Sequence, residues 1–342
     1  MKYVVKKPSS EKVTSTQVAK LAGVSQSAVS RVFTPGANVS KRMSEKVRAA
    51  ADKLGYRPNA LARSLITGKS QIIGLVVTYL ENQFYPQAIE RLSNELQKYG
   101  YHILIFMASN DNKNTQTVID ELLDYQVDGI ITASVGLSND LTARCEAAGI
   151  PIVLFNRQQD CDHISGVCSD NVSGGRKLAE LLVNAGHKRI AHIAGWESAS
   201  TQRDREAGFM YGLQMAGQTL YAREVGNFDF DEAKEATRRM FAGEDIPDAV
   251  FVANDHMAFA VMDVLRHELK LRIPEDVSVV GYDDVPLSAW SSYDLTTIRQ
   301  PVDRMVEETV RTLLSHIDEP DSEARRISID GPLVLRGSCR LP

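Results

Sequence analysis

Four polar side chains near the N-terminus carry hydrogen-bond donors and acceptors that could pair with a polar or anionic ligand. The polar face of a predicted helix over residues 26–33 carries Gln26, Ser27, Ser30 and Arg31, and Ser25 is a good N-cap for that helix. An amide, a hydroxyl and a guanidinium all hydrogen-bond to bases, and arginine also pairs with phosphate. This face by itself fits a solvated surface equally well, so the elements that position it decide between the two interpretations.

Two further helices support this face. Thr14 and Gln17 form a capping-box pattern that begins a first helix, and Gly23 supplies the left-handed residue that ends it. A third helix runs from its cap Ser40 to Leu54. Two short helices joined by a tight turn and braced by a third form a helix-turn-helix, whose second helix enters the major groove. The apolar sides expected to face inward are Val18, Leu21, Met43, Val47, Ala50 and Leu54.

Positive and negative charge are distributed unevenly between the N-terminal segment and the rest of the chain. Residues 1–70 hold 14 Lys and Arg against 3 Asp and Glu, a balance of +11, whereas the rest of the chain has a balance of −16. A small basic segment on a large acidic body is typical of a polyanion-binding head. A helical bundle without nucleic acid explains the apolar sides, but it explains neither this charge nor the polar outer face. We therefore predict an all-α, DNA-binding helix-turn-helix domain over residues 1–57.

Residues 58–70 are predicted to be a hinge helix and linker. Asn59 can cap a helix after a proline, but only about seven residues follow before Gly68, and a helix this short is marginal alone in water. Leu61 and Leu65 lie four residues apart and share a face that needs a cover. The cover is a second copy of the helix, the large domain or a nucleic-acid groove. An ordinary linker with two stray leucines is the alternative.

Residues 71–342 have the pattern of an α/β domain. Short β-rich runs such as 72–77 and 129–132 alternate with helical stretches such as 172–185. This alternation predicts mostly parallel, doubly wound sheets. The segment is long for one such sheet, and a second series begins near residue 160, so we expect two lobes with a ligand cleft between them. The expected N-lobe covers about 71–158 and 295–324, and the expected C-lobe about 159–294 and 325–342.

Polar side chains follow several of these strands. Ligands of parallel sheets bind beyond the carboxyl ends of the strands, so these side chains are candidate pocket residues. Helix capping and loop hydrogen bonding are the alternative role, which we favour for Asp255 and Asp284. The candidates are Asn156, Arg157, the loop 196–205, Asn254, Asp255, Asp283 and Asp284.

Catalytic and metal-binding patterns are missing from the sequence. Asp283 and Asp284 are adjacent on a strand and point apart, and His187 and His192 lack the spacing of a helical zinc site. No Gly-x-Ser-x-Gly elbow occurs. We expect no enzyme activity, no catalytic residue, no metal site and no cofactor.

Composition and the N-terminal sequence indicate a cytoplasmic globular protein. No apolar run approaches the roughly 18 residues that a membrane span needs, and no secretory signal is visible. We expect no membrane partner. Four widely spaced cysteines predict reduced thiols and no disulfide framework: Cys145, Cys161, Cys168 and Cys339.

A series of motifs resembles the lactose-repressor/galactose-repressor (LacI/GalR) family of bacterial transcription regulators. The motifs stand in family order along the chain: VTSTQVAKLAGVSQSAVSRVF (13–33), VSKRMSEKVRAAADKLGYRPNALARSL (39–65), SDNVSGG (169–175), GHKRIAHIAG (186–195), FVANDHMAFAVM (251–262), VSVVGYDD (277–284), LTTIRQP (295–301) and LVLRGS (333–338). Each motif is weak alone, but the series is specific. The resemblance implies a periplasmic-binding-protein-like effector and dimerisation domain behind the head, and a homodimer that binds operator DNA, most simply as a repressor.

The resemblance also implies roles for residues of the head. Those that match base-reading positions are Gln26, Ser27 and Arg31, and those that match phosphate contacts are Thr14, Ser25, Thr34 and Ser40. The hinge helix is matched by Asn59, Leu61 and Leu65. In this scheme Leu61 packs on its mate, and Leu65 is a wedge in the minor groove that bends the duplex.

In the large domain the resemblance implies contacts with a small-molecule effector. The matching residues are Phe84, Tyr85, Asn156, Arg205, Phe228, Asn254 and Asp283. The position of Asn156 is often Asp in the family. Here a neutral amide stands in place of a carboxylate, and Arg157 and Arg205 add positive charge, so this wall repels an anion less. We therefore hypothesise that the effector is a sugar acid or a sugar phosphate rather than a neutral sugar. The alternative functions are a solute-binding receptor and a metabolic enzyme fused to a DNA-binding head.

Overall fold

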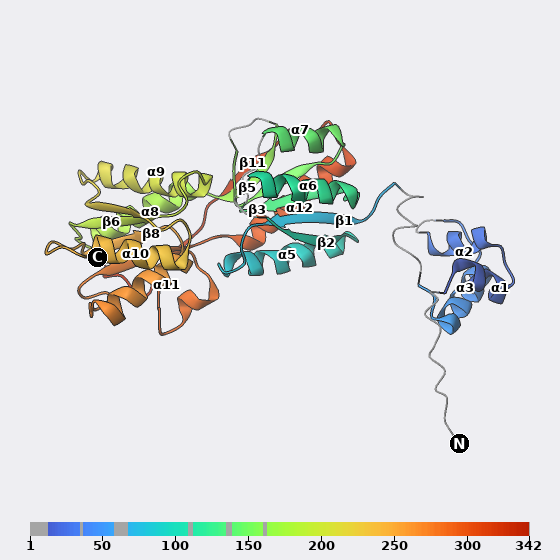
Figure 1. Ribbon diagram of the computed structural model, residues 1–342, viewed down its shortest axis with the longest axis horizontal. Helices are drawn as coiled ribbons and strands as arrows, with labels where there is room; N and C mark the ends of the chain where they lie inside the picture. Colours follow the sequence, from blue (N-terminus) through green and yellow to red (C-terminus); the bar gives the residue numbers. More distant parts are fainter. Residues whose placement is uncertain are drawn as a thin grey trace, which may run out of the picture. The chain divides into compact units, whose positions relative to one another are not determined.

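The computed structural model describes residues 13–34, 37–57, 68–108, 112–134, 139–159 and 163–341. The chain forms two compact units, Met1–Ser70 and Gln71–Pro342 (Figure 1). The division between them falls where the sequence places the end of the linker. None of the helices in the described ranges is long and apolar enough to cross a lipid bilayer.

The first unit contains the three predicted helices, α1 (Ser15–Ala22), α2 (Gln26–Phe33) and α3 (Lys41–Leu54). Val18, Val29 and Val47 form the centre of their core. Two expected core side chains face solvent instead, because Leu21 is 46% and Met43 37% exposed. A domain of this size has too little interior to cover every apolar position of three short helices.

The first lobe of the second unit, the N-lobe, is a parallel six-stranded sheet in the order β11-β5-β4-β3-β1-β2. Its strands are β1 (Ile72–Val77), β2 (His102–Met107), β3 (Gly129–Ala133), β4 (Ile152–Phe155), β5 (Ser165–Ser169) and β11 (Arg326–Ile329). Helices α5 (Phe84–Lys98) and α12 (Val302–Asp318) pack on one face, and α6 (Asn112–Asp124) and α7 (Asn139–Ala147) lie on the other (Figure 1).

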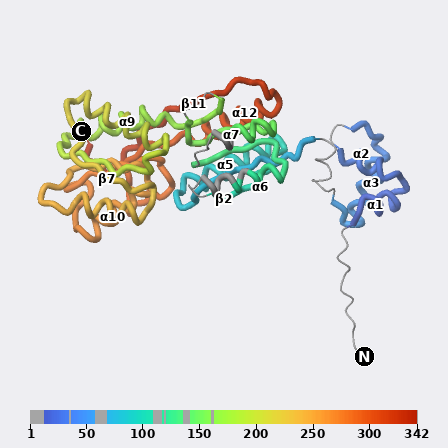
Figure 2. The backbone as a smooth tube through the Cα atoms, turned by 45° about the horizontal axis from the view of Figure 1, so that its top comes forward, coloured from blue at the N-terminus to red at the C-terminus, as the bar shows by residue number. Residues whose placement is uncertain are grey.

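The second lobe, the C-lobe, repeats this plan in the order β12-β10-β9-β8-β6-β7, with only β12 antiparallel. Its strands are β6 (Ile190–Ala194), β7 (Ala222–Val225), β8 (Ala249–Val252), β9 (Ser278–Asp283), β10 (Thr296–Arg299) and β12 (Leu333–Val334). One face carries α8 (Asn171–Asn184) and α9 (Ser200–Met215), and the other carries α10 (Phe230–Met240) and α11 (Asp255–Asp263). In the tube view α10 lies beside β7 at the edge of this lobe (Figure 2).

The expected lobe boundaries were wrong in three places. Strands β5 and β11 belong to the N-lobe, and β10 belongs to the C-lobe. The chain therefore crosses between the lobes at residue 170, at 300–301 and at 330–332. For β5 the physical reason is that its sequence, Ser-Gly-Val-Cys-Ser, lacks an apolar run that would identify it as a strand. Its place in the N-lobe sheet depends on pairing with β4 and β11, which the local sequence does not reveal.

Helices α8 and α9 pack unusually closely. A Cβ added at Gly208 would overlap the backbone carbonyl of Val172, and one added at Gly175 would overlap that of Arg205. Glycine at both contact points lets the two backbones meet. This contact places α9, and with it Arg205, against the first turn of α8.

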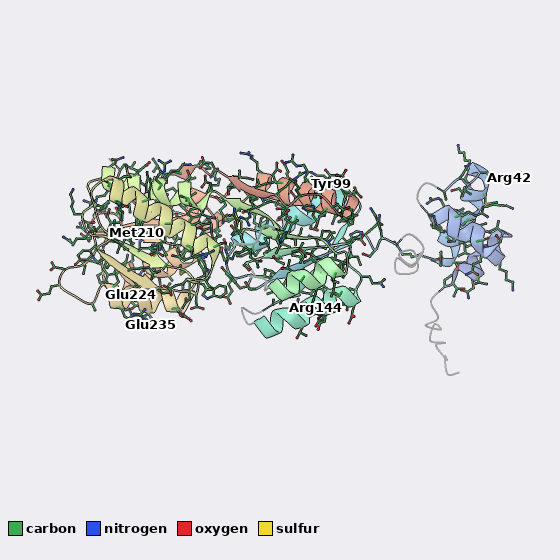
Figure 3. All side chains as sticks on the ribbon, turned by 90° about the horizontal axis from the view of Figure 1, so that it is seen from above. Arg42, Tyr99, Arg144, Met210, Glu224 and Glu235 are labelled. Atoms are coloured by element: carbon green, nitrogen blue, oxygen red, sulfur yellow. The ribbon has the colours of Figure 1, made fainter. Side chains whose placement is uncertain are left out.

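Side chains on the outer surfaces, such as Met210, Tyr99 and Arg144, reach solvent (Figure 3).

Candidate nucleic-acid interface and effector cleft

The predicted reading face of α2 is solvent-exposed. Gln26, Ser27 and Arg31 are all exposed, while Val29 and Val32 on the opposite side are buried. The three polar side chains are therefore available to a ligand on one side of the helix. This is the orientation that a recognition helix needs.

Neighbouring hydroxyls hold two of these side chains in place. Gln26 Nε2 donates to Ser15 Oγ at 3.0 Å, so the first turn of α1 positions this amide. The hydroxyls of Ser25 and Ser27 lie 2.9 Å apart. Ser25 also caps α2, because its Oγ accepts from the amide of Ala28 at 3.2 Å.

The other predicted phosphate contacts lie at helix ends. Thr14 closes the capping box of α1 with Gln17, and Ser40 Oγ accepts from the amide of Met43 at 3.4 Å. Ser40 Oγ only accepts, so its proton is still available to a phosphate, whereas Thr14 Oγ1 also donates to Gln17 Oε1 at 3.5 Å. Thr34 also differs from Ser40, since its Oγ1 donates to the carbonyl of Ser30 at 2.9 Å and its one proton is used. The hinge residues Asn59, Leu61 and Leu65 lie outside the described residues.

A cavity of about 220 Å³ opens at the switch points of the two sheets. Thr78 and Tyr79 follow β1, Ser134 follows β3 and Trp196 follows β6, so the carboxyl ends of strands from both lobes meet there. Strand order reverses between β1 and β3 and between β6 and β8, the place where open α/β sheets bind ligands. The lining residues are Thr78, Tyr79, Glu81, Ser134, Arg157, Trp196, Asn227, Phe228 and Asp229.

Six residues at strand ends near the lobe interface have a strained backbone, and three of them line this cavity. Several non-glycine residues have positive φ angles, a conformation that costs of order 1–3 kcal/mol and tends to mark functional sites. Those near the strand ends of the cleft are Ser134 (φ 67°), Asn156 (56°), Asn227 (52°), Phe228 (60°), Asp283 (129°) and Asp284 (55°).

Arg157 is a buried cation on the wall of the cavity, with 5% of its surface exposed. Its Nη1 donates to the carbonyl of Asn156 at 3.2 Å and to Thr201 Oγ1 across the cleft at 2.6 Å. Its Nε is buried and has no hydrogen-bond partner. The guanidinium also lies 6.0 Å from the ring centre of Phe228.

Asn156 and Tyr85, two predicted effector contacts, lie together in the N-lobe. Asn156 Nδ2 donates to the Tyr85 hydroxyl at 3.4 Å, and both side chains are buried. The other amide atom, Asn156 Oδ1, is buried without a partner. Asn156 itself does not line the cavity of about 220 Å³, whereas the next residue in the chain, Arg157, does.

Arg205 and Asp283 pair with each other in the C-lobe. Arg205 Nη2 lies 3.2 Å from Asp283 Oδ1, and the two side chains are each 2% exposed. Arg205 also donates to Asn171 Oδ1 at 2.9 Å and to the carbonyl of Ala253 at 2.6 Å. Burial raises the pKa of Asp283, and Arg205 opposes that shift. The pair is therefore close to neutral as a unit, with most of the fork of Arg205 occupied.

Hydrogen bonds connect the lobes on both sides of the cleft. Asn82 Nδ2 in the N-lobe donates to Asp283 Oδ2 at 3.1 Å. The backbone N–H of Gln158 donates to Ser200 Oγ of the C-lobe at 2.9 Å, beside the Arg157–Thr201 hydrogen bond. These hydrogen bonds join the two lobes beside the cavity.

Phe84 and Asn254 have protein partners that explain them. Phe84 stacks on Phe155 with ring centres 6.1 Å apart, inside the N-lobe core. Asn254 caps α11, since its Oδ1 accepts from the amide of Met257 at 2.9 Å. Phe228 is 8% exposed and packs over Gly195, where a Cβ would overlap its ring.

The carboxylate of Asp255 holds together segments of the C-lobe. Asp255 is fully buried and accepts from the Val285 amide, Ser288 Oγ and Thr297 Oγ1 at 3.1, 2.6 and 2.7 Å. Burial raises the pKa of Asp255 to about 7. This geometry favours the hydrogen-bonding role over a pocket role for Asp255.

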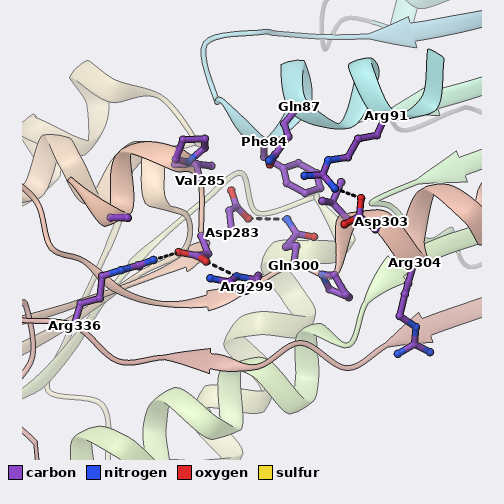
Figure 4. A pocket seen from close by; sticks show the side chains of 15 residues that line it. Phe84, Gln87, Arg91, Asp283, Val285, Arg299, Gln300, Asp303, Arg304 and Arg336 are labelled. Atoms are coloured by element: carbon purple, nitrogen blue, oxygen red, sulfur yellow. Dashed lines mark hydrogen bonds and ion pairs between the residues drawn. The ribbon is translucent and has the colours of Figure 1, made fainter. Parts of the chain in front are cut away.

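A larger cavity, about 510 Å³, lies against the crossing segment at 300–301 (Figure 4). Three of its arginines form ion pairs, Arg91 with Asp303, and Arg299 and Arg336 with Asp284 at 2.5 and 2.6 Å; Arg304 also lines the cavity and forms no ion pair with a described residue. These ion pairs connect α5 to α12, and connect β10 and the residues after β12 to the end of β9. The described residues contain no group of three or more His, Cys, Asp or Glu side chains placed to hold a metal ion.

Hydrogen bonds through His192 and Gln202 hold the loop that carries Trp196. His192 Nδ1 lies 3.0 Å from the carbonyl of Phe251, and Gln202 Nε2 donates to His192 Nε2 at 3.2 Å. Gln202 Oε1 in turn accepts from the Gly195 amide at 2.6 Å. Burial lowers the pKa of His192 to about 4, so the ring is neutral at pH 7. The Nδ1–H tautomer satisfies both contacts.

Sequence reasoning missed several residues that line the cleft: Thr78, Tyr79, Glu81, Ser134, Asn227 and Asp229. Tyr79 and Ser134 follow strands that the sequence does predict, so the strand-end rule could have found them. Thr201 lies within the loop 196–205, but its contact with Arg157 joins the two lobes, and no local signal predicts it.

Comparison with known proteins agrees with this architecture. The model of bacterial regulatory proteins of the lacI family matches residues 16–59, and that of the periplasmic binding protein-like domain matches residues 179–339. The chain is 32% identical over 331 residues to the ribose operon repressor of Escherichia coli (strain K12), covering 95% of this chain and 99% of that protein.

Solved structures resemble the whole chain as well. A complex of the transcriptional regulator CelR with cellobiose has a TM-score of 0.72 at 30% identity and covers 96% of this chain and 100% of its own. The Lac repressor dimer bound to operator and the anti-inducer ONPF has a TM-score of 0.86 at 29% identity, covering 96% of this chain and 99% of its own. With a helix-turn-helix head, two parallel-sheet lobes and relatives of this kind along nearly its full length, the chain belongs to the LacI family of bacterial regulatory proteins.

Proposed function

We propose that the chain is a sequence-specific DNA-binding transcription repressor whose operator affinity is controlled by a small carbohydrate-type effector. The exposed face of Gln26, Ser27 and Arg31 on α2 carries this proposal, because it presents base-reading groups on a basic head. Phosphate contacts supply affinity and salt dependence, and these three side chains supply base choice.

The effector site is the cleft between the lobes. Support comes from the cavity at both switch points, the unpartnered Nε of Arg157 and the unpartnered Oδ1 of Asn156. Trp196 and Phe228 provide aromatic surface for a sugar ring. A sugar, a sugar acid or a sugar phosphate fits these groups. The CelR relative, bound to cellobiose, supports a carbohydrate effector.

The protein acts as a homodimer, with one head on each half of a near-palindromic operator. The relative solved as a dimer on operator DNA supports this assembly. So does β2, an edge strand whose Ile105 and Met107 are 46% and 49% exposed, since an open apolar edge invites a second chain.

Effector and operator communicate through the hinge. Closing of the lobes on the effector shifts the lobe next to residues 58–70, which alters the pairing of two marginal hinge helices. The coupling is reciprocal, so operator changes effector affinity by the same factor. Since the proposed partner is operator DNA, the protein acts in the cytoplasm, and the proposal includes no catalytic step, cofactor, metal or membrane.

One experiment tests the function against its alternatives. Purified protein is incubated with genomic fragments at two salt concentrations, with and without candidate sugars, and the retained fragments are sequenced. A repressor retains few fragments, with affinity that falls steeply with salt and changes with an effector. A solute receptor retains none, and an enzyme fused to a DNA-binding head consumes its sugar.

A further inference from the structure

We propose that the effector carries an anionic group, a carboxylate or a phosphate, and that Arg157 receives it. This inference rests on the proposed effector cleft and narrows its ligand to acidic sugars. The sequence suggested Arg157 and Arg205 together for this role, and their different counter-charges favour Arg157 alone.

The two cleft arginines differ in their counter-charge. Arg205 faces the carboxylate of Asp283 at 3.2 Å, so a ligand anion there would meet a near-neutral pair. Arg157 is equally buried, yet its hydrogen bonds go to a neutral carbonyl and the hydroxyl of Thr201. Among the described residues no carboxylate forms an ion pair with it. A buried cation without a counter-ion is costly, and an anion that fills the cavity would compensate it.

The edge of the Arg157 guanidinium that has no hydrogen-bond partner has the shape that acidic groups require. Its Nη1 is engaged, whereas Nε is buried without a partner and Nη2 forms no hydrogen bond with a described residue. Nε and Nη2 form one side of the guanidinium fork, whose two parallel N–H groups match two oxygens of a carboxylate or phosphate. A neutral hydroxyl would satisfy only one of them.

Two carboxylates also line the cavity and oppose an anion. Glu81 and Asp229 are both exposed, so water and salt screen their fields. Asp229 is further committed to capping α10, where its Oδ1 accepts from the amides of Asp231 and Glu232. Tyr79 stays neutral, because burial raises its pKa well above the usual value. Arg157 is therefore the charge that a ligand meets at the buried wall.

The size and walls of the cavity define the rest of the ligand. About 220 Å³ is the space of roughly seven liquid water molecules, which suits one sugar ring with an acidic substituent. Trp196 and Phe228 line the cavity and can cover the ring. A monosaccharide acid or monosaccharide phosphate follows from these groups.

Calorimetric titration of the full-length protein with matched probes tests this inference. The neutral probes are glucose, galactose and ribose; the acidic probes are glucuronate, galacturonate, gluconate, glucose 6-phosphate and ribose 5-phosphate. We expect at least one acidic probe to bind about tenfold or more tighter than its neutral parent. In R157Q this ratio should fall to near one.

Two control variants separate charge from fold. Thr201→Val removes the hydroxyl that Arg157 contacts but keeps the guanidinium, and Arg144→Gln removes an exposed arginine that pairs with Asp120. Both should keep the preference for the acidic probe. Loss of the preference in T201V as complete as in R157Q would show that Arg157 acts only by connecting the lobes, and would overturn the assignment.

The pH dependence distinguishes the two acidic groups. Between pH 5.5 and 7.5 a phosphate monoester loses its second proton, near pH 6, so its affinity should rise, while that of a carboxylate stays flat. Equal binding of neutral and acidic probes, or binding of none of the acidic probes, would overturn the inference. The proposed function survives that result if operator affinity still responds to a neutral sugar, and it fails separately if no operator is bound.

Discussion

At the residue scale, the buried charges of the cleft differ in how they are compensated. Arg205 and Asp283 compensate each other, and Asn82 and Gln300 add donors to the same carboxylate. Such a pair contributes little net stability over an apolar replacement, but breaking it leaves one charge uncompensated.

We therefore expect Asp283→Asn to destabilise the Gln71–Pro342 unit by about 3–5 kcal/mol, because Arg205 stays charged and buried. Denaturant unfolding of the full chain, followed by tryptophan fluorescence, measures this loss. Asp330→Asn is the control, since Asp330 pairs with Lys177 while 60% exposed, and should cost under about 1 kcal/mol. Equal losses in the two variants would show that the buried pair is not special.

His192 predicts how stability changes below neutral pH. Its pKa is lowered to about 4 in the folded protein, because burial disfavours the charged ring, whereas the unfolded residue takes up a proton near pH 6.5. The stability that the neutral ring provides is therefore present above pH 6.5 and is lost as the pH falls toward 4, at up to about 1.4 kcal/mol per unit.

The comparison variant is His192→Gln, which cannot titrate. Unfolding free energies of both proteins at pH 7, 6, 5 and 4 should converge as the acid removes the advantage of the wild type. Parallel curves across this range would mean that His192 does not control the acid sensitivity.

Gln26 offers a test of base reading without a change in charge. Gln26→Ala should lose about 1–3 kcal/mol of discrimination at one operator base pair, because the amide no longer reaches its edge. The salt dependence of binding should stay the same, since no phosphate contact is removed. Binding to a set of operator variants at two salt concentrations measures both quantities, and a uniform loss on all sequences would contradict base reading.

At the element scale, the contact between α8 and α9 is the tightest constraint on the cleft. Gly208 and Gly175 bring the two helix backbones together, and Arg205 lies on α9 three residues before Gly208. A shift of α9 thus moves an arginine of the cleft.

We expect Gly208→Ala to cost about 3 kcal/mol of stability, because its Cβ would overlap the carbonyl of Val172 and force the helices apart. Thermal unfolding measures the loss, and effector titration should show weakened binding as Arg205 moves. Gly243→Ala is the matched control, because no atom lies within 4 Å of a Cβ built there. Similar behaviour of the two variants would argue against close backbone packing.

At the scale of the whole molecule, the charge distribution separates the two proposed roles. The basic head attracts DNA, and the acidic remainder is repelled by it, so operator contact should be confined to the head and the hinge. Whatever transmits effector binding must therefore pass through residues 58–70.

Leu65→Ala should weaken operator binding and reduce DNA bending while effector affinity in the absence of DNA stays unchanged. The reason is that a methyl group is too small to hold a base step apart, whereas the effector cleft is untouched. Gel mobility of operator fragments with the site at different positions measures the bend, and calorimetry measures the effector. An unchanged bend angle and operator affinity would refute the wedge role.

Much of the fold could be predicted from the sequence, because its signals are local. The caps Thr14, Ser25 and Ser40 and the apolar period of α2 define the head within a few residues. Continuous apolar runs such as 72–77 identify buried parallel strands. The motif series adds the family, which the comparisons confirm.

Tertiary structure decided what depends on distant partners. Strand β5 joined the N-lobe through pairing with β11, some 160 residues away. The charge of Arg205 is compensated by an ion pair with Asp283, 78 residues away. Arg157, next in the chain to the predicted Asn156, kept an open edge because no carboxylate folded against it. Residue type and spacing determine which groups are present, but burial and long-range pairing determine which of them still have a hydrogen bond or a charge to offer a ligand.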